Sequence, residues 1–360
     1  MLEVVREYAV ERLGDGSDLD GRHLAYYVAF ADAAEPELSR GDQETWFKRV
    51  EDELDNLRKA LAHALAQRDG SSALRLVVGI RRFWQIHGYL AEGRDALEAA
   101  LALVSDEPSE LRSQALNMAG ILAGEQGDFD AARTNFNAAL DDARAVGTTR
   151  AISSALVNLG NLAFFGGELD AARELYKESI EYFRSLGDVR GEALANENVG
   201  LMALTADDIP EAVRWLGTAV ELARAGGDER EIGAATRSLA AALLEVDRRV
   251  EADQLLEESL EIARRLGDAH GIAVSLETIA GLAATAGDAD RAATLFGASD
   301  AVRSAIGAQR QPDNQVLYER WLARTLARLD TNAYSRRYED GRALTTEEAC
   351  ALAVGMPLSG

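Results

Sequence analysis

Small and large apolar residues recur along residues 114–307 with a period of 40, and five units share one register. Each unit has a small residue at Gly120, Gly160, Gly200, Ala240 and Ala280. A second small residue follows 12 positions later, at Ala132, Ala172, Ala212, Ala252 and Ala292. A large residue and a third small residue follow at Phe136 and Ala139, Tyr176 and Ser179, Leu216 and Ala219, Leu256 and Ser259, and Phe296 and Ser299. Paired small residues let two antiparallel helices approach closely. Each unit therefore predicts a helical hairpin whose apolar face is buried by the next hairpin.

Glycine and aspartate mark the ends of these helices with the same period. The second helices are predicted to stop at Gly147, Gly187, Gly227, Gly267 and Gly307, because glycine accepts the left-handed conformation just past a helix. Asp188, Asp228 and Asp268 follow at once and are predicted to cap the next helix. The shorter turns within the hairpins carry Gly127, Gly167 and Gly287, with Asp207 and Asp247 in the same slot.

Outside the regular units the apolar pattern remains helical. It predicts helices over 22–38 and 46–66, a divergent hairpin over 71–87 and 91–104, a helix over 315–329 and two short helices within 331–353. Gly93, Leu97 and Ala100 give the divergent hairpin the small, large and small positions of the repeats. The predicted organisation is N-terminal helices in 1–68, a repeat array in 69–307 (degenerate repeat 71–104, five regular repeats 110–307), C-terminal capping helices in 308–354, and a disordered tail in 355–360.

Composition excludes several classes of partner. The chain carries 38 Lys and Arg against 61 Asp and Glu, a formal charge of −23, which argues against direct binding of nucleic acid or of anionic membranes. No uninterrupted run of about 18 apolar residues is evident, so no membrane span is predicted. With Cys350 as the one cysteine, no internal disulfide can form, and a cytoplasmic location is expected.

Catalytic motifs are missing from the sequence. No G-x-x-x-x-G-K-[ST] phosphate loop occurs, and none of Lys48, Lys59 and Lys177 follows a glycine. The four histidines lie far apart and lack the spacing of metal ligands. The chain is therefore predicted to be no enzyme and to use no cofactor or metal.

The order of small and large positions resembles the tetratricopeptide (TPR) pattern L-G-x2-Y…A-x3-F, although the period exceeds the usual value of about 34 residues. The resemblance implies an all-α fold, an α-solenoid of TPR-like helical hairpins with helical N- and C-terminal caps. TPR proteins generally bind peptides or ligands in a concave groove lined by their first helices. At that face we predict partner-binding residues Asn117, Asn161, Phe164, Glu197, Arg237 and Glu277. A solvated, uncommitted surface is the alternative for the polar members, and a core role is the alternative for Phe164.

The ends of the chain carry further blocks, LEVVREYAVERL from Leu2 to Leu13, RHLAYYVAFADAAEPEL from Arg22 to Leu38, EDELDNLRKAL from Glu51 to Leu61, LFGA from Leu295, YE from Tyr318 and GRAL from Gly341. These blocks resemble the C-terminal region of actinobacterial NB-ARC/STAND-type ATPase transcriptional regulators, the SARP, LuxR and maltose-regulator-like proteins. In that family the TPR array is a sensor arm that follows an ATPase and a winged-helix segment. The chain lacks the ATPase and DNA-binding modules.

The resemblance implies a non-catalytic domain for protein–protein interaction or ligand sensing within a transcriptional regulator. Its expected partners are a protein, peptide or small effector in the groove and the ATPase/winged-helix module of the parent regulator. A free-standing TPR scaffold or chaperone-like adaptor is the alternative.

Overall fold

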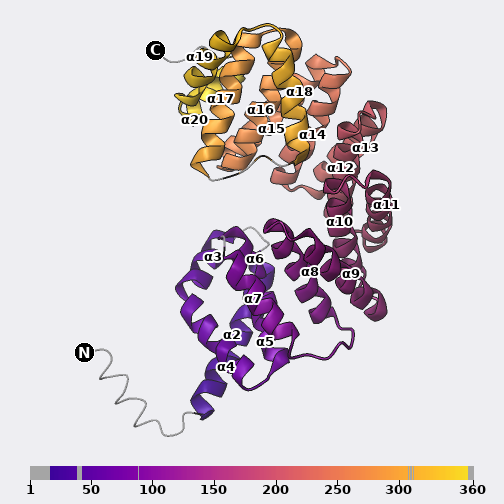
Figure 1. Cartoon of the computed structure of the whole chain (residues 1–360), viewed down its shortest axis with the longest axis vertical. Helices are drawn as coiled ribbons and strands as arrows, with labels where there is room; N and C mark the ends of the chain where they lie inside the picture. The colour runs from indigo at the N-terminus through magenta and orange to yellow at the C-terminus, as the bar shows by residue number, and fades with distance from the viewer. Residues whose placement is uncertain are drawn as a thin grey trace, which may run out of the picture. The chain divides into compact units, whose positions relative to one another are not determined.

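The computed structural model describes residues 17–38, 43–87, 89–306, 308, 310 and 312–355. Within these residues the chain forms 19 α-helices and no β-strand (Figure 1). The block from Leu2 to Leu13, the predicted cap at Gly307 and residues 356–360 of the predicted tail lie outside the described residues. The fold is an α-solenoid of TPR-like hairpins, as the repeat register predicts.

Two compact units divide the chain, one over Met1–Leu162 and one over Ala163–Gly360. The helices of the first unit are α2 (Ser17–Glu37), α3 (Gln43–Asp52), α4 (Leu54–Ala66), α5 (Gly70–Gly79), α6 (Arg81–Ile86), α7 (Leu90–Leu101), α8 (Glu110–Glu125), α9 (Phe129–Val146) and most of α10 (Thr149–Phe165). The unit boundary falls inside α10 and therefore cuts across the predicted repeat array.

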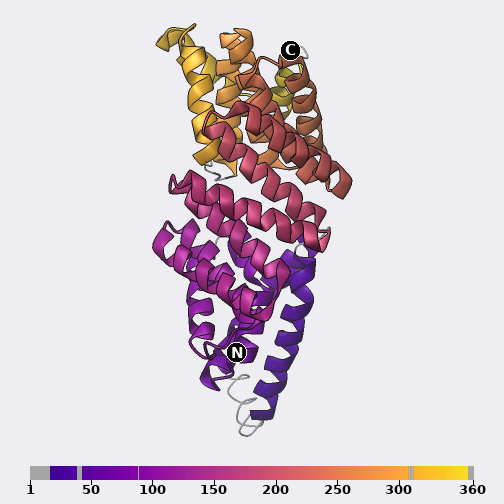
Figure 2. The ribbon, with the colours of Figure 1, turned by 90° about the vertical axis from the view of Figure 1, so that its right-hand side faces the viewer.

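The second unit continues the hairpins and ends in three further helices. Its helices are α11 (Leu169–Leu186), α12 (Val189–Thr205), α13 (Ile209–Gly226), α14 (Glu229–Glu245), α15 (Arg249–Arg265), α16 (Ala269–Ala286), α17 (Ala289–Ala305), α18 (Pro312–Leu326), α19 (Thr331–Arg342) and α20 (Thr346–Ala353). Helices α12 and α13, α14 and α15, and α16 and α17 pack in pairs, and their layers can be followed in Figure 2.

The repeat positions form the centre of each hairpin, which confirms the predicted register. All five alanines of the second small row, from Ala132 to Ala292, are fully buried. The large residues pack onto the glycines of their own hairpins. A Cβ at Gly120 would lie 2.5 Å from the Phe136 ring, and one at Gly200 would lie 2.5 Å from Leu216. At these two glycines the large side chain packs directly against the backbone of the paired helix. A larger residue in place of either glycine would force the two helices apart.

Buried serine hydroxyls add hydrogen bonds between the paired helices. Ser259 Oγ donates to the Gly233 carbonyl at 2.7 Å, and Ser299 Oγ donates to the Ala273 carbonyl at 2.8 Å. These serines occupy the third small row, so the same hydrogen bond occurs at the same repeat position in two hairpins. A small polar residue is accommodated in this core because its hydroxyl has an acceptor.

The predicted caps are also confirmed. Gly147, Gly187, Gly227 and Gly267 have φ of 79°, 64°, 73° and 63°. In the glycine slot of the short turns, Asp207 and Asp247 adopt φ of 63° and 60°, where aspartate is better tolerated than most residues. Asp188 and Asp268 accept hydrogen bonds from the backbone N–H of Gly191 and Gly271, at 3.1 and 2.9 Å.

The helix predicted over 46–66 is wrong, because the chain breaks at Glu53 between α3 and α4. The Glu53 carboxylate accepts hydrogen bonds from Tyr27 Oη at 2.5 Å and from Asn56 Nδ2 at 2.8 Å. Burial of Tyr27 and its bond to Glu53 raise the pKa of this phenol to about 12. The break thus places the carboxylate against α2, a non-local contact that the local helical pattern does not reveal.

One described helix, α16, is long and apolar enough to cross a membrane by length and composition alone, although it is no uninterrupted apolar run, since it contains His270 and Glu277. Within the fold 72% of that helix is buried. Its apolar character follows from its position, because α14, α15, α17, α18 and α20 all pack against it.

Candidate functional site

Two of the predicted groove residues take part in a ladder that links successive first helices. Asn117 on α8 accepts a hydrogen bond from Asn158 Nδ2 on α10 at 2.9 Å. Glu197 on α12 accepts one from Ser238 Oγ on α14 at 2.7 Å. Both bonds join residues 41 apart, so the same register is used in both units. These hydrogen bonds therefore help to set the spacing of successive hairpins. Binding of a partner by the same side chains stays a prediction.

Three other predicted residues lie in different surroundings. Arg237 Nη1 on α14 lies 3.5 Å from Ser259 Oγ, and Asn161 on α10 is half-buried. Phe164, near the end of α10, is half-buried against the exposed ring of Phe165, with 5.5 Å between the ring centroids.

Glu277 requires a correction, because it lies inside the second unit and not on an open groove. Its side chain is 2% exposed. Its carboxylate lies 3.3 Å from Arg303 Nη2 and 2.8 Å from Arg310 Nε. Burial raises the pKa of Glu277, and the two guanidinium groups oppose that shift. The residue is thus the anion of a buried charge cluster and is not free to bind a partner.

Helix α18 covers the face on which Glu277 was predicted to be exposed. It packs against α12, α16 and α17, and it lies beside α14 and α16 in Figure 1. Its buried stripe is Leu317, Trp321 and Thr325, at 3%, 1% and 0% exposure. The indole of Trp321 rests on Gly281, where a Cβ would lie only 2.4 Å from the ring. The inner face of this unit therefore already holds an amphipathic helix, supplied by the chain itself.

A single carboxylate anchors α18 to α14. Glu245, the last residue of α14, is 6% exposed and accepts hydrogen bonds from Trp321 Nε1 at 3.2 Å and from Arg324 Nη2 at 2.7 Å. Arg320 Nη1 lies 3.3 Å from the same carboxylate. An anion at the C-terminal end of a helix opposes the helix dipole. The two arginines of α18 compensate that unfavourable charge.

Sequence reasoning did not find this face, although one signal for it was present. The position after the first small residue is Ile121, Asn161, Leu201, Ala241 and then Gly281. Glycine in the last repeat leaves room for a large side chain from elsewhere. Leu317 and Trp321 lie four residues apart on one face of the predicted helix over 315–329, which marks that helix as one that could fill the space.

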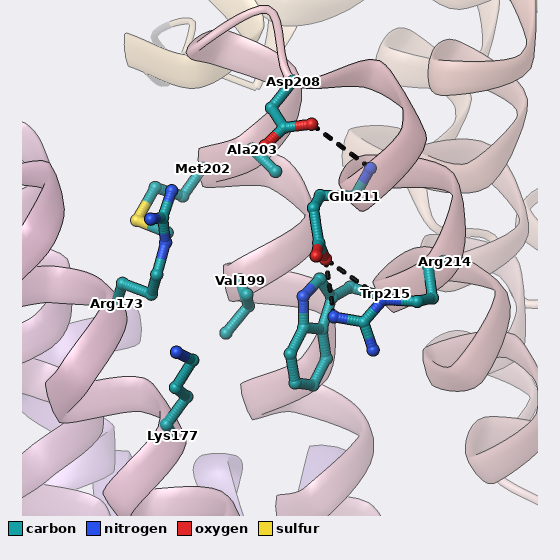
Figure 3. A pocket seen from close by; sticks show the side chains of 9 residues that line it. All are labelled: Arg173, Lys177, Val199, Met202, Ala203, Asp208, Glu211, Arg214 and Trp215. Carbon is teal, nitrogen blue, oxygen red and sulfur yellow. Dashed lines mark hydrogen bonds and ion pairs between the residues drawn. The ribbon is translucent and has the colours of Figure 1, made fainter.

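A separate pocket of about 170 Å³ lies between α11 and α13 and is floored by α12 (Figure 3). Arg173 and Lys177 lie on one side of it, with Trp215 on the other. Its charged groups have partners on their own helices. Lys177 pairs with Glu174 at 3.3 Å, and Arg214 pairs with Glu211. The pocket is a seam between two second helices.

No metal centre or reactive thiol stands out in the described ranges. Within them, no group of three or more His, Cys, Asp or Glu side chains could hold a metal ion. Cys350 is buried in α20, and burial raises the pKa of its thiol. Of the tryptophans in the second unit, Trp321 is buried, whereas Trp215 lines the pocket described above.

The register of the hairpins, their caps and their polar inner faces define a TPR-like α-solenoid. A family model described as tetratricopeptide repeat matches residues 150–227. This range covers two hairpins, α10 with α11 and α12 with α13.

Part of the sequence is similar to mycobacterial proteins. Proteins from Mycobacterium bovis and from two strains of Mycobacterium tuberculosis, named as HTH-type transcriptional regulators, are each 37% identical over 95 residues. The matched segment spans 26% of this chain and 11% of each relative. The matched segment thus spans about a tenth of the length of those relatives.

Solved structures share the fold at low sequence identity. One is a Signal Transduction ATPase with Numerous Domains (STAND) protein with a TPR sensor from Pyrococcus horikoshii, with a TM-score of 0.53, 15% identity, and coverage of 94% of this chain and 54% of that one. Another is a Rap protein complexed with competence and sporulation factor, with a TM-score of 0.53, 13% identity, and coverage of 90% and 99%. The Rap conjugation gene regulator of plasmid pLS20, in complex with the Phr* peptide, has a TM-score of 0.51 at 12% identity, over 91% and 98%.

Proposed function

We propose that the chain is a non-catalytic interaction and ligand-sensing region of a bacterial signal-transduction ATPase transcriptional regulator of the NB-ARC/STAND type. The observation that carries this proposal is the 37% identity over 95 residues with mycobacterial transcriptional regulators. The terminal sequence blocks and the fold shared with the TPR sensor of a STAND protein support it. The expected location is the cytoplasm, where such regulators act.

The proposed partners act at two surfaces. A protein, peptide or small effector would bind the inner faces of the first helices, and the Rap conjugation gene regulator of similar fold, in complex with the Phr* peptide, supports this proposal. The ATPase and winged-helix module of the parent regulator would dock near residues 1–110. The net charge of −23 favours a partner with basic groups and disfavours direct contact with nucleic acid.

The regulator context is tested by the DNA upstream of the Met1 codon, translated in frame. The proposal expects an open frame with a G-x-x-x-x-G-K-[ST] loop about 200–400 residues earlier, room for one to three domains. A stop codon directly upstream, with a separate ribosome-binding site, would contradict it. That result would favour the free-standing scaffold or chaperone-like adaptor.

A further inference from the structure

The chemistry of α18 specifies what its docking surface recognises. The surface consists of Gly281, Glu245 and Asp207, from three successive hairpins of the second unit. Gly281 receives an indole, Glu245 accepts the N–H of that indole and binds two guanidinium groups, and Asp207 lies 3.4 Å from Arg320 Nη1. A helix that binds this surface needs an aromatic residue, one arginine directly before it and another three positions after it.

Two helices other than α18 cover the end of the last hairpin. Helix α19 crosses α17 at Gly297 and Gly341, where a Cβ on either glycine would lie less than 2 Å from a backbone carbonyl oxygen of the other helix. Helix α20 packs on α16 and α17 and buries Ala349, Cys350 and Ala353. The end of the last hairpin is therefore covered by α19 and α20, while α18 lies on the inner face.

We infer that this inner face is a docking site for a helix of a partner protein with the pattern Arg-Trp-x-x-Arg, and that α18 is the built-in occupant which this partner displaces. The inference deepens the proposed function and rests on it only for the identity of the partner. Because α18 is tethered, it competes at an effective concentration on the order of millimolar. A helix of a separate protein can therefore bind this surface only when the contacts between α18 and the surface are weakened.

Two full-length variants separate release of α18 from loss of the site. Arg320→Glu with Arg324→Glu places two carboxylates against Glu245, so α18 is released while its surface stays intact. Gly281→Leu fills the space of the indole with the residue found at Leu201, the same register two repeats earlier. It releases α18 and also blocks the surface. Hydrogen exchange measures the release, and we expect α18 amides in both variants to exchange about tenfold faster or more than in the parent chain.

Binding is measured with a fluorescently labelled synthetic peptide of residues 312–329 and, as control, the same peptide with Trp321→Ala. We expect the arginine double variant to bind the unaltered peptide about tenfold more tightly, or better, than the parent chain does. Gly281→Leu is expected to bind neither peptide, and the control peptide is expected to bind no variant.

Either of two results overturns the inference. Unchanged protection of α18 in both variants would show that it is a permanent part of the core. Release of α18 without peptide binding to the arginine double variant would show that the exposed face is no docking site. Both results are independent of the upstream reading frame, so failure here leaves the regulator assignment standing.

Discussion

At the residue scale, glycines determine where two helices of this fold can cross in close contact. Gly297 and Gly341 belong to two sequence blocks that are separated along the chain, and the structure shows them meeting at the crossing of α17 and α19. A Cβ on Gly297 would lie 1.9 Å from the Tyr338 carbonyl oxygen. Since that atom belongs to a helix backbone, it cannot move aside as a flexible side chain would.

Gly297→Ala should therefore destabilise the second unit by about 3 kcal/mol or more, through overpacking. Gly217→Ala, in the middle of α13, is the matched control, because the described part of the chain places nothing within 4 Å of its Cβ. Replacing this helical glycine by alanine should raise the unfolding free energy by about 0.5–1 kcal/mol. Urea unfolding of both variants, followed by circular dichroism, checks the difference. Equal midpoints would refute the close crossing.

At the element scale, the last hairpin holds a cluster of buried charges around Glu277. Arg303 on α17 has a side chain that is 5% exposed, and among the described atoms its Nε and Nη1 lack a hydrogen-bond partner. Its charge is balanced chiefly by Glu277, which Arg310 also contacts. Removing one member of such a buried group leaves an uncompensated charge.

Glu277→Gln keeps the shape of the side chain and removes that charge, so we expect a loss of about 3–5 kcal/mol in unfolding free energy. Glu181→Gln is the control, since Glu181 is 73% exposed and pairs with Arg184 at the surface. An exposed pair of this kind contributes about 1 kcal/mol or less. Chemical denaturation of the two variants gives the comparison, and a similar small loss in both would show that the cluster is hydrated.

The sequence predicted what depends on short-range geometry. The spacing that places Gly120 over Phe136 lies within one hairpin, as do the caps at Asp188 and Asp268, so a periodic pattern could reveal them. It did not predict the break at Glu53, the burial of Glu277 or the position of α18. Each of these depends on a contact between segments that the period does not relate. Trp321 meets Gly281 and Glu245 from a helix outside the repeats.

At the scale of the whole molecule, the inner faces of the first helices serve two purposes. In both units, hydrogen bonds between residues 41 apart fix the spacing of successive hairpins. In the second unit, the inner face around Gly281 and Glu245 binds α18 through Trp321 and two arginines. The array is acidic and already binds α18, a helix with an aromatic and basic face. It is therefore suited to bind a similar helix of a partner protein in place of α18.

The central claim, that α18 is a separable occupant of a binding face, is tested most directly by native-state hydrogen exchange on the unaltered chain. We predict that the amides of α18 exchange together through an opening that leaves α16, α17 and α19 protected, at a free energy below that of global unfolding. If α18 and α16 instead exchange only through one common unfolding event, α18 is an integral part of the core, and the account of the inner face is contradicted.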